Sequence, residues 1–466
     1  MGENFDPSEL ERRDIDRRRG YQELLDFYHG VHWEGRERRA ERRLTFNYAK
    51  VFIDKAASYL MSGTGFVIEP GDDSEETRAR AGRAEVALHK VAQENNLEQL
   101  DFETEIDCAV LGDACYKVIW DQETKSVRVT TPDIQGIYVW WGRDDSAKIW
   151  QVASRYSLNA DVAENLYQIK PKDKQAINLI ELWTAQEFEL WVDGNQVESK
   201  PNPYGFIPFV IYPNLREPKR FWGVSDLLPI MEPQRELNRA TSQLSKILEL
   251  SGNPIAVLEN VEESKDIAIR PGSVWNIPED AKAYLLDLLQ GGGVRLHIDY
   301  INILYRILHD LSESPRAAFG GTERDLSGVA LEIELQPLLQ KVRRKRIIRN
   351  AVYQQRSRLI LKLLEKYQNE DFSNVNLRVI WAPVLPQDMA KLVSNEQALV
   401  QNGIHSRRRA MDEIGVQDPE MEFDRWLEER EAILRMNKEI NGKLPRGGER
   451  ARNSETPAKA ARQPSP

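Results

Sequence analysis

The longest helical pattern in the chain limits its possible folds more than any other feature. Residues 329–367 read as one helix that is interrupted only by Pro337. At a rise of 1.5 Å per residue, about 40 residues would span ~60 Å, well beyond the length of an average helix. Proline removes a backbone hydrogen bond from a helix interior, so we expect Pro337 to kink this helix near its start.

Two shorter amphipathic helices precede the long one, and a small insert separates them. Helical spacing predicts the first at 225–251, with Ser225 as its N-cap. The second covers 294–311 and carries a near-heptad apolar stripe. The insert has short strand patterns at 255–258 and 274–277. These helices need burial partners, and interfaces between identical subunits in a ring would supply them.

The part of the chain before these helices mixes helical and strand patterns. Helices are predicted at 47–60 and, as two consecutive elements, within 75–111. The strands that accompany them are short and closely spaced, which favours a mostly antiparallel meander and an α+β domain. The strands are predicted at 66–70, 115–120, 127–131, 137–141, 149–156, 177–183, 188–192 and 206–212.

The N-terminal segment is polar. Residues 1–43 are rich in arginine interleaved with acids, and residues 24–28 give one helix a partly apolar face. We interpret this segment as a solvated, salt-bridged helix pair. An arm that contacts a neighbouring subunit or nucleic acid is the alternative.

The C-terminal segment begins with a strand at 376–381. Helices are predicted after it at 388–400, 406–414 and 419–440. From residue 441 onward the chain has almost no bulky apolar side chains, so we expect a disordered tail.

Charge and composition exclude several partners. The 466-residue chain has a formal net charge of −10 at pH 7. Such a chain is unsuited to tight, sequence-independent wrapping of DNA, although a channel through which DNA slides needs few strong phosphate contacts. No apolar run approaches the roughly 18 residues of a membrane span, so we expect no membrane partner. Cys108 and Cys115 are interpreted as small apolar core residues in a reducing cytoplasm.

The sequence carries no recognisable catalytic motif. The phosphate-binding patterns GxxxxGKS and GxxxxGKT, the zinc-binding pattern HExxH and the nucleophile pattern GxSxG do not occur. His297 and His309 would lie about 18 Å apart along one helix, too far to share a metal. We therefore expect no catalytic residue, no metal and no cofactor. A metal-dependent nucleic-acid enzyme with an unrecognised carboxylate site stays open as the alternative.

One cluster of charge is unusual in a chain with this net charge. Between residues 341 and 362 the long helix carries many basic side chains and no acid. Two interpretations are left open: contact with DNA phosphates, or neutralisation by an acidic surface of a neighbouring copy such as 418–429. The residues that we assign to this contact are Lys341, Arg343, Arg344, Lys345, Arg346 and Arg349.

Several stretches in a fixed order resemble one protein family. They are NYAKVFIDKAASYLMSGTGFVI from residue 47, LGDACYKVIWD from 111, FIPFVIYPN from 206 followed by GVSDLLPI and SGNPIAVLE, LSGVALEIELQPLLQK from 326 and IWAPVLPQD from 380. In combination they resemble the portal proteins, or head–tail connectors, of tailed bacteriophages. The resemblance covers most of residues 45–436 and leaves out the N-terminal segment and the tail.

The resemblance implies that the body of the chain divides into the parts of a portal subunit. These are an α+β wing domain (47–224), a first stem helix (225–252), a clip (253–292), a second stem helix (293–311), a tunnel loop (312–328), a long kinked helix (329–370) and a C-terminal strand with a helical crown (371–440). The N-terminal charged arm (1–46) and the disordered tail (441–466) lie outside the resemblance and are predicted from composition.

The resemblance also implies a function and partners. The expected assembly is a homo-oligomeric ring, commonly a dodecamer, at the unique capsid vertex, with the host cytoplasm as the site of assembly. Its channel would carry double-stranded DNA during packaging and ejection. The ring would dock the terminase large subunit and a head–tail adaptor, and would contact the capsid and scaffolding protein, with no enzymatic activity of its own.

The tunnel loop would lie nearest to the DNA. Its charged residues are Arg316, Glu323, Arg324 and Asp325. Their mixed signs fit a loop that touches DNA without holding it. A scaffold that binds other proteins without DNA is a further alternative.

Overall fold

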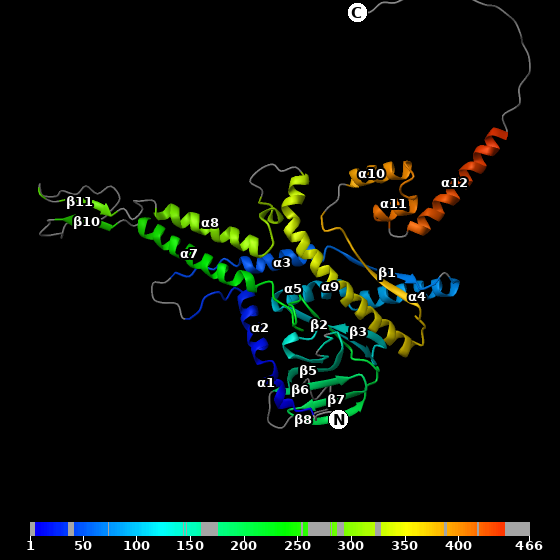
Figure 1. Cartoon of the computed structure of the whole chain (residues 1–466), viewed down its shortest axis with the longest axis horizontal. Helices are drawn as coiled ribbons and strands as arrows, with labels where there is room; N and C mark the ends of the chain where they lie inside the picture. The colour runs from blue at the N-terminus through cyan, green and yellow to red at the C-terminus, as the bar shows by residue number, and fades with distance from the viewer. Residues whose placement is uncertain are drawn as a thin grey trace, which may run out of the picture. The chain divides into compact units, whose positions relative to one another are not determined.

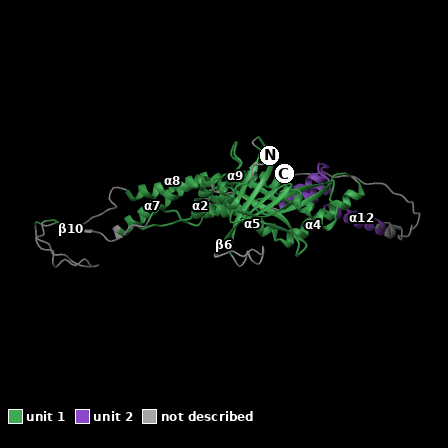
Figure 2. Ribbon diagram, turned by 90° about the horizontal axis from the view of Figure 1, so that it is seen from below, with its two compact units in different colours: residues 1–384 green, residues 385–466 purple. Residues whose placement is uncertain are grey.

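The computed structural model describes residues 5–35, 42–72, 74–142, 144–145, 147–159, 176–252, 255–259, 280, 282–286, 293–321, 328–385, 389–416 and 419–442. The described residues form eleven α-helices and twelve strands, and the strand pairs are antiparallel. The chain divides into two compact units, residues 1–384 and 385–466 (Figure 2). The predicted α+β class is confirmed.

The N-terminal helices are part of the folded core of the first unit. Helix α1 covers Pro7–Arg13 and α2 covers Ile15–Tyr28. Tyr21, Leu24 and Phe27 of α2 are buried in the main hydrophobic core. The interpretation as a solvated helix pair is therefore wrong for this face, because its apolar residues lie in the core, where α2 packs against α5 and α3.

Three further helices of the first unit follow the predicted pattern. They are α3 (Tyr48–Leu60), α4 (Glu75–Glu94) and α5 (Leu97–Leu111). Gly112 ends α5 with a φ of 92°, a left-handed conformation that favours glycine. A Cβ atom at Gly112 would lie 2.8 Å from the backbone nitrogen of Ser225, so the close approach of these two segments also requires glycine.

Two antiparallel sheets form the centre of the first unit. One has five strands in the order β4-β5-β6-β7-β8, and the other has three in the order β3-β2-β9. The five-stranded sheet confirms the predicted meander, whereas in the three-stranded sheet β9 pairs with β2 across a long stretch of sequence. Strand β8 was not predicted, because all seven of its residues are exposed and leave no alternating pattern to detect. The strands are β2 (Asp113–Asp121), β3 (Ser126–Thr130), β4 (Ile137–Trp141), β5 (Ile149–Asn159), β6 (Ala176–Thr184), β7 (Glu187–Val192), β8 (Asn195–Pro201) and β9 (Phe209–Pro213).

A further sheet joins an early and a late segment of the first unit. Strand β1 (Thr64–Pro70) pairs antiparallel with β12 (Val375–Trp381), with Phe66 opposite Val379. Ile68 and Val379 are buried in the core that this sheet shares with α4 and the long helix. This pair of strands therefore brings residues 64–70 and residues 375–381 of the first unit together.

Two helices run side by side and carry a hairpin between their ends (Figure 1). They are α7 (Leu228–Gly252) and α8 (Gly293–Leu311), and the hairpin consists of β10 (Ile255–Glu259) and β11 (Lys282–Leu286). The strand predicted at 274–277 lies outside the described residues. Helix α7 begins at Leu228, three residues later than predicted. Ser225 lies before the helix, and the Ser225 hydroxyl donates a hydrogen bond to the carbonyl of Val110.

The long helix is present as predicted. Helix α9 covers Gly328–Gln368 and continues through Pro337. The second unit contains α10 (Met389–Gln401), α11 (Arg407–Glu413) and α12 (Pro419–Gly442), which also agree with the predicted helices. The residues of the expected disordered tail beyond 442 lie outside the described part of the chain, and the kink at Pro337 stays a prediction.

Candidate functional site

A row of cationic side chains on helix α9 points into the interior of the first unit. Lys341, Lys345, Arg349 and Arg356 are buried, and the two arginines are 0% exposed. Residues 341, 345 and 349 are spaced by four, and 356 follows 349 by seven, so the four side chains lie on one face of the helix. Burying a charge is costly unless a counter-ion is present, and each of these cations has one.

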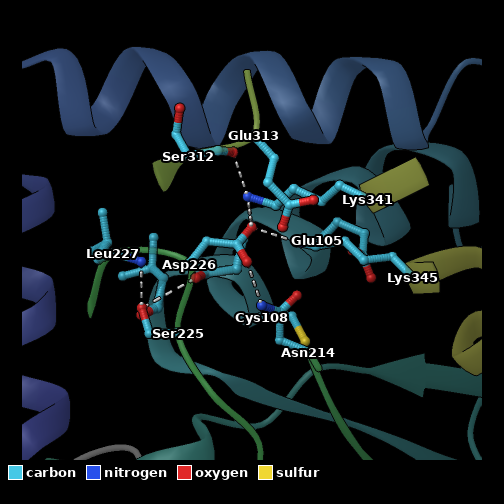
Figure 3. Close-up of polar contacts among 12 residues, drawn as sticks. Glu105, Cys108, Asn214, Ser225, Asp226, Leu227, Ser312, Glu313, Lys341 and Lys345 are labelled. Carbon is cyan, nitrogen blue, oxygen red and sulfur yellow. Dashed lines mark hydrogen bonds and ion pairs between the residues drawn. The ribbon is translucent and has the colours of Figure 1, made fainter. Parts of the chain in front are cut away.

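The first counter-ion lies just before α7. The ammonium nitrogens of Lys341 and Lys345 lie 3.2 Å and 2.6 Å from the carboxylate of Asp226, to which Asn214 also donates at 3.0 Å (Figure 3). Burial alone would raise the pKa of Asp226, but the two lysines hold it well below its usual range. This cluster therefore fastens α9 to the start of α7.

The other two counter-ions lie one turn apart on α5. Arg349 donates from Nε and Nη2 to the two carboxylate oxygens of Glu105, at 2.6 Å and 2.9 Å, and from Nη1 to the carbonyl of Asn214 at 2.8 Å. Arg356 forms a second two-point pair with Asp101. Such bidentate pairs fix orientation as well as distance. These two pairs fasten the middle of α9 to α5.

The basic cluster predicted from sequence therefore contains two kinds of residue, those that are buried and paired and those that are exposed. Lys341, Lys345 and Arg349 are paired inside the chain and lack the exposed surface that contact with DNA or a neighbouring copy requires. Arg343 and Arg344 are exposed, whereas Arg346 is half-buried. The four-residue spacing of the buried cations was visible in the sequence, but the partners that it needs come from α5 and from residue 226.

Arg346 stabilises the end of the β1–β12 sheet. Its Nη1 donates to the carbonyl of Ala382 at 2.9 Å and its Nη2 donates to the carbonyl of Leu60 at 3.1 Å. Its guanidinium also lies over the ring of Trp381, 4.7 Å from the ring centre. These contacts give Arg346 a role within its own chain.

The loop between α8 and α9 is described over residues 312–321. It contains a short 3-10 helix, Arg316–Phe319, and the guanidinium of Arg316 lies over the ring of Tyr305. Phe319 lies edge-on to Phe52 of α3, which anchors this half of the loop on the first unit. Glu323, Arg324 and Asp325, which were predicted to lie near DNA, are outside the described residues.

The described residues contain no group of three or more histidine, cysteine or carboxylate side chains that could hold a metal ion. In the same part of the chain, no helix combines the length and apolar character needed to cross a membrane. Cys108 and Cys115 are free and buried, as predicted, and burial raises the pKa of both thiols.

Asp113 joins α2 to the segment that precedes α7. Its carboxylate accepts a hydrogen bond from the Tyr21 hydroxyl at 2.6 Å and another from the Gly223 backbone nitrogen at 2.7 Å. Burial raises its pKa to about 6, although the two hydrogen bonds oppose this shift. Ionised Asp113 is therefore less stable in the folded protein than in the unfolded chain.

We expect Asp113 to make the protein less stable as the pH rises from about 4 to about 6. The folded pKa lies above the unfolded value, so its stabilising contribution is complete below the unfolded pKa and is lost on ionisation, at a cost of about 3 kcal/mol. His32 and His309, whose pKa values burial lowers, act in the opposite direction. The measurement is the free energy of unfolding against pH for the wild type and Asp113→Asn. Parallel curves for the two proteins would contradict the assignment.

The contacts of this region fasten helices to one another and to the end of the β1–β12 sheet. A model of the phage portal protein family, SPP1 Gp6-like, matches residues 8–435, and the chain belongs to this family. A comparison with curated proteins finds no match. The resemblance seen in the sequence is confirmed, but its limit at residue 45 is wrong, because the family match includes the N-terminal helices.

Membership of this family establishes the general role of the chain. It is a portal protein of a tailed bacteriophage, a structural component of the capsid vertex that serves DNA packaging.

Proposed function

We propose that this portal protein assembles into a closed homo-oligomeric ring, commonly a dodecamer, whose axial channel carries double-stranded DNA during packaging and ejection. The hairpin end of α7 and α8 would dock the terminase large subunit and later the head–tail adaptor. The capsid and scaffolding protein would contact other faces of the ring. Assembly would take place in the host cytoplasm.

The observation that carries the proposal is a second apolar face on α8. Leu304 and Leu308 are buried in the core, as expected for one face of an amphipathic helix. A separate row of apolar side chains is exposed, with Leu296 at 72% and Ile303 at 44%. Its members are Leu296, Tyr300, Ile303, Ile307 and Leu311, spaced by three or four residues. We call this row the α8 stripe.

The first turns of α9 add to the exposed apolar surface. Val329 and Ile333 lie one helical turn apart and are 63% and 66% exposed. An exposed row of apolar side chains such as the α8 stripe marks an interaction site on a soluble protein. If the α8 stripe of one copy meets a different surface of the next, the contact is heterologous, and repeated rotation closes it into a ring.

The test is the assembly state of the purified full-length chain. Native mass spectrometry at micromolar concentration should give a single large oligomer, and negative-stain images should show rings with a central hole. A particle that stays monomeric under these conditions would overturn the proposal.

A further inference from the structure

We propose that Lys341 and Arg344 of α9 are positioning residues that clamp the base of the loop between α8 and α9. The loop leaves α8 at Ser312 and Glu313, and these two residues contact the clamp. The relevance of the clamp to DNA rests on the proposed function, in which this loop faces the channel. The clamp itself follows from contacts within one chain.

The inner contact of the clamp is buried. Lys341 Nζ donates to the carbonyl oxygen of Ser312 at 3.1 Å while it lies 3.2 Å from Asp226 (Figure 3). Ser312 is 2% exposed, and its backbone nitrogen continues the hydrogen bonding of α8 to Leu308. One ammonium group therefore ties the first residue of the loop to the start of α7.

The outer contact lies three residues further along α9, on the same side of the helix. Arg344 Nη2 donates to both carboxylate oxygens of Glu313, at 2.6 Å and 2.7 Å. Both side chains are partly exposed, so this contact opens more easily than the buried one.

The backbone of Glu313 supports a specific role for its side chain. Its φ is 54°, a left-handed conformation in which a helix usually ends with glycine. Ser314 then bonds back to the carbonyl of His309 at 3.1 Å, which completes the end of α8. Glycine would fit this position with less strain but would provide no carboxylate for Arg344.

The consequence is that the loop starts from a fixed base. Asp226 lies before α7, Ser312 follows α8, and Lys341 belongs to α9, so the inner contact joins three helices where the loop begins. A force on the loop would be transmitted to the start of α7 through this contact. The outer contact, between Arg344 and Glu313, limits the movement of the loop before that movement strains the inner contact between Lys341 and Ser312.

Hydrogen–deuterium exchange of the purified full-length protein tests the clamp. Arg344→Gln should speed exchange of backbone amides in residues 312–321 about three-fold, because an exposed ion pair is lost. Lys341→Met should speed it about ten-fold or more, since a charged hydrogen bond is lost while Asp226 keeps Lys345. Exchange within 350–364 of α9 should stay unchanged in both variants.

Two controls separate a positioning role from a general loss of stability. Arg343→Gln removes an exposed charge next to the clamp and should leave the exchange of residues 312–321 as in the wild type. The charge swap Glu313→Arg with Arg344→Glu should restore most of the protection. Unchanged exchange in both clamp variants, or equal acceleration across α5 and α9, would overturn the proposal. The clamp is judged from differences in exchange between variants at one protein concentration, and the ring from the assembly state, so the two are tested separately.

Discussion

Replacing Arg349 by methionine is expected to lower the free energy of unfolding by about 3–5 kcal/mol, because it leaves a buried carboxylate without its counter-ion. Glu105 is 1% exposed and accepts two hydrogen bonds from Arg349. The substitution would also remove the donor to the carbonyls of Pro213 and Asn214. The measurement is urea-induced unfolding at one fixed protein concentration, since assembly also affects apparent stability.

Two further variants make this prediction specific. Arg358→Met removes an exposed arginine from the same helix and should change stability by no more than about 0.5 kcal/mol. The double variant Glu105→Leu with Arg349→Met should recover about half of the loss, because an apolar pair avoids the unpaired charge but leaves two carbonyls without a donor. An equal effect of Arg349→Met and Arg358→Met would show that the pair with Glu105 is not what holds α9.

The second large effect is expected from Ile303→Asp, which places a charge in the middle of the α8 stripe. Ile303 is 44% exposed in the single chain, so the substitution should leave the fold intact. If the stripe lies between copies, an unpaired carboxylate would be buried at every interface of the ring, at several kcal/mol each. Native mass spectrometry should then show monomers in place of the closed oligomer.

The matched control is Asn302→Asp, which adds the same charge to an exposed neighbouring position of α8. This variant should assemble as the wild type does. Unfolding curves for both variants should confirm that they are folded. Rings formed by Ile303→Asp in normal yield would mean that the α8 stripe is not part of the subunit interface.

Local patterns were sufficient to predict most helices and strands. Asn47 and Ser74 cap α3 and α4 with their side chains, and helices with such signals began where expected. Strands with an alternating or continuous apolar pattern were also found. Strand β8 was not predicted, because it depends on pairing with β7. The late start of α7 was not predicted either, because it depends on a contact between Ser225 and Val110.

The site was harder to predict, because charge in a sequence does not reveal burial. Lys345 and Arg343 look alike in the sequence, yet one lies 2.6 Å from Asp226 in the interior and the other is exposed. The counter-ions Asp226 and Glu105 are separated from α9 by more than a hundred residues of sequence. Only the folded chain brings these partners together, so the sequence supported two interpretations of the cluster and missed the buried one.

The pairing of β1 with β12 has a consequence for biosynthesis. Strand β1 leaves the ribosome early, whereas its partner β12 is made only after nearly all of the first unit. Until then β1 has an unpaired edge, and unpaired edges invite association with other chains. Contacts between distant parts of a chain also slow folding. A nascent chain therefore carries this unpaired edge, with the risk of premature association, until translation of the first unit is complete.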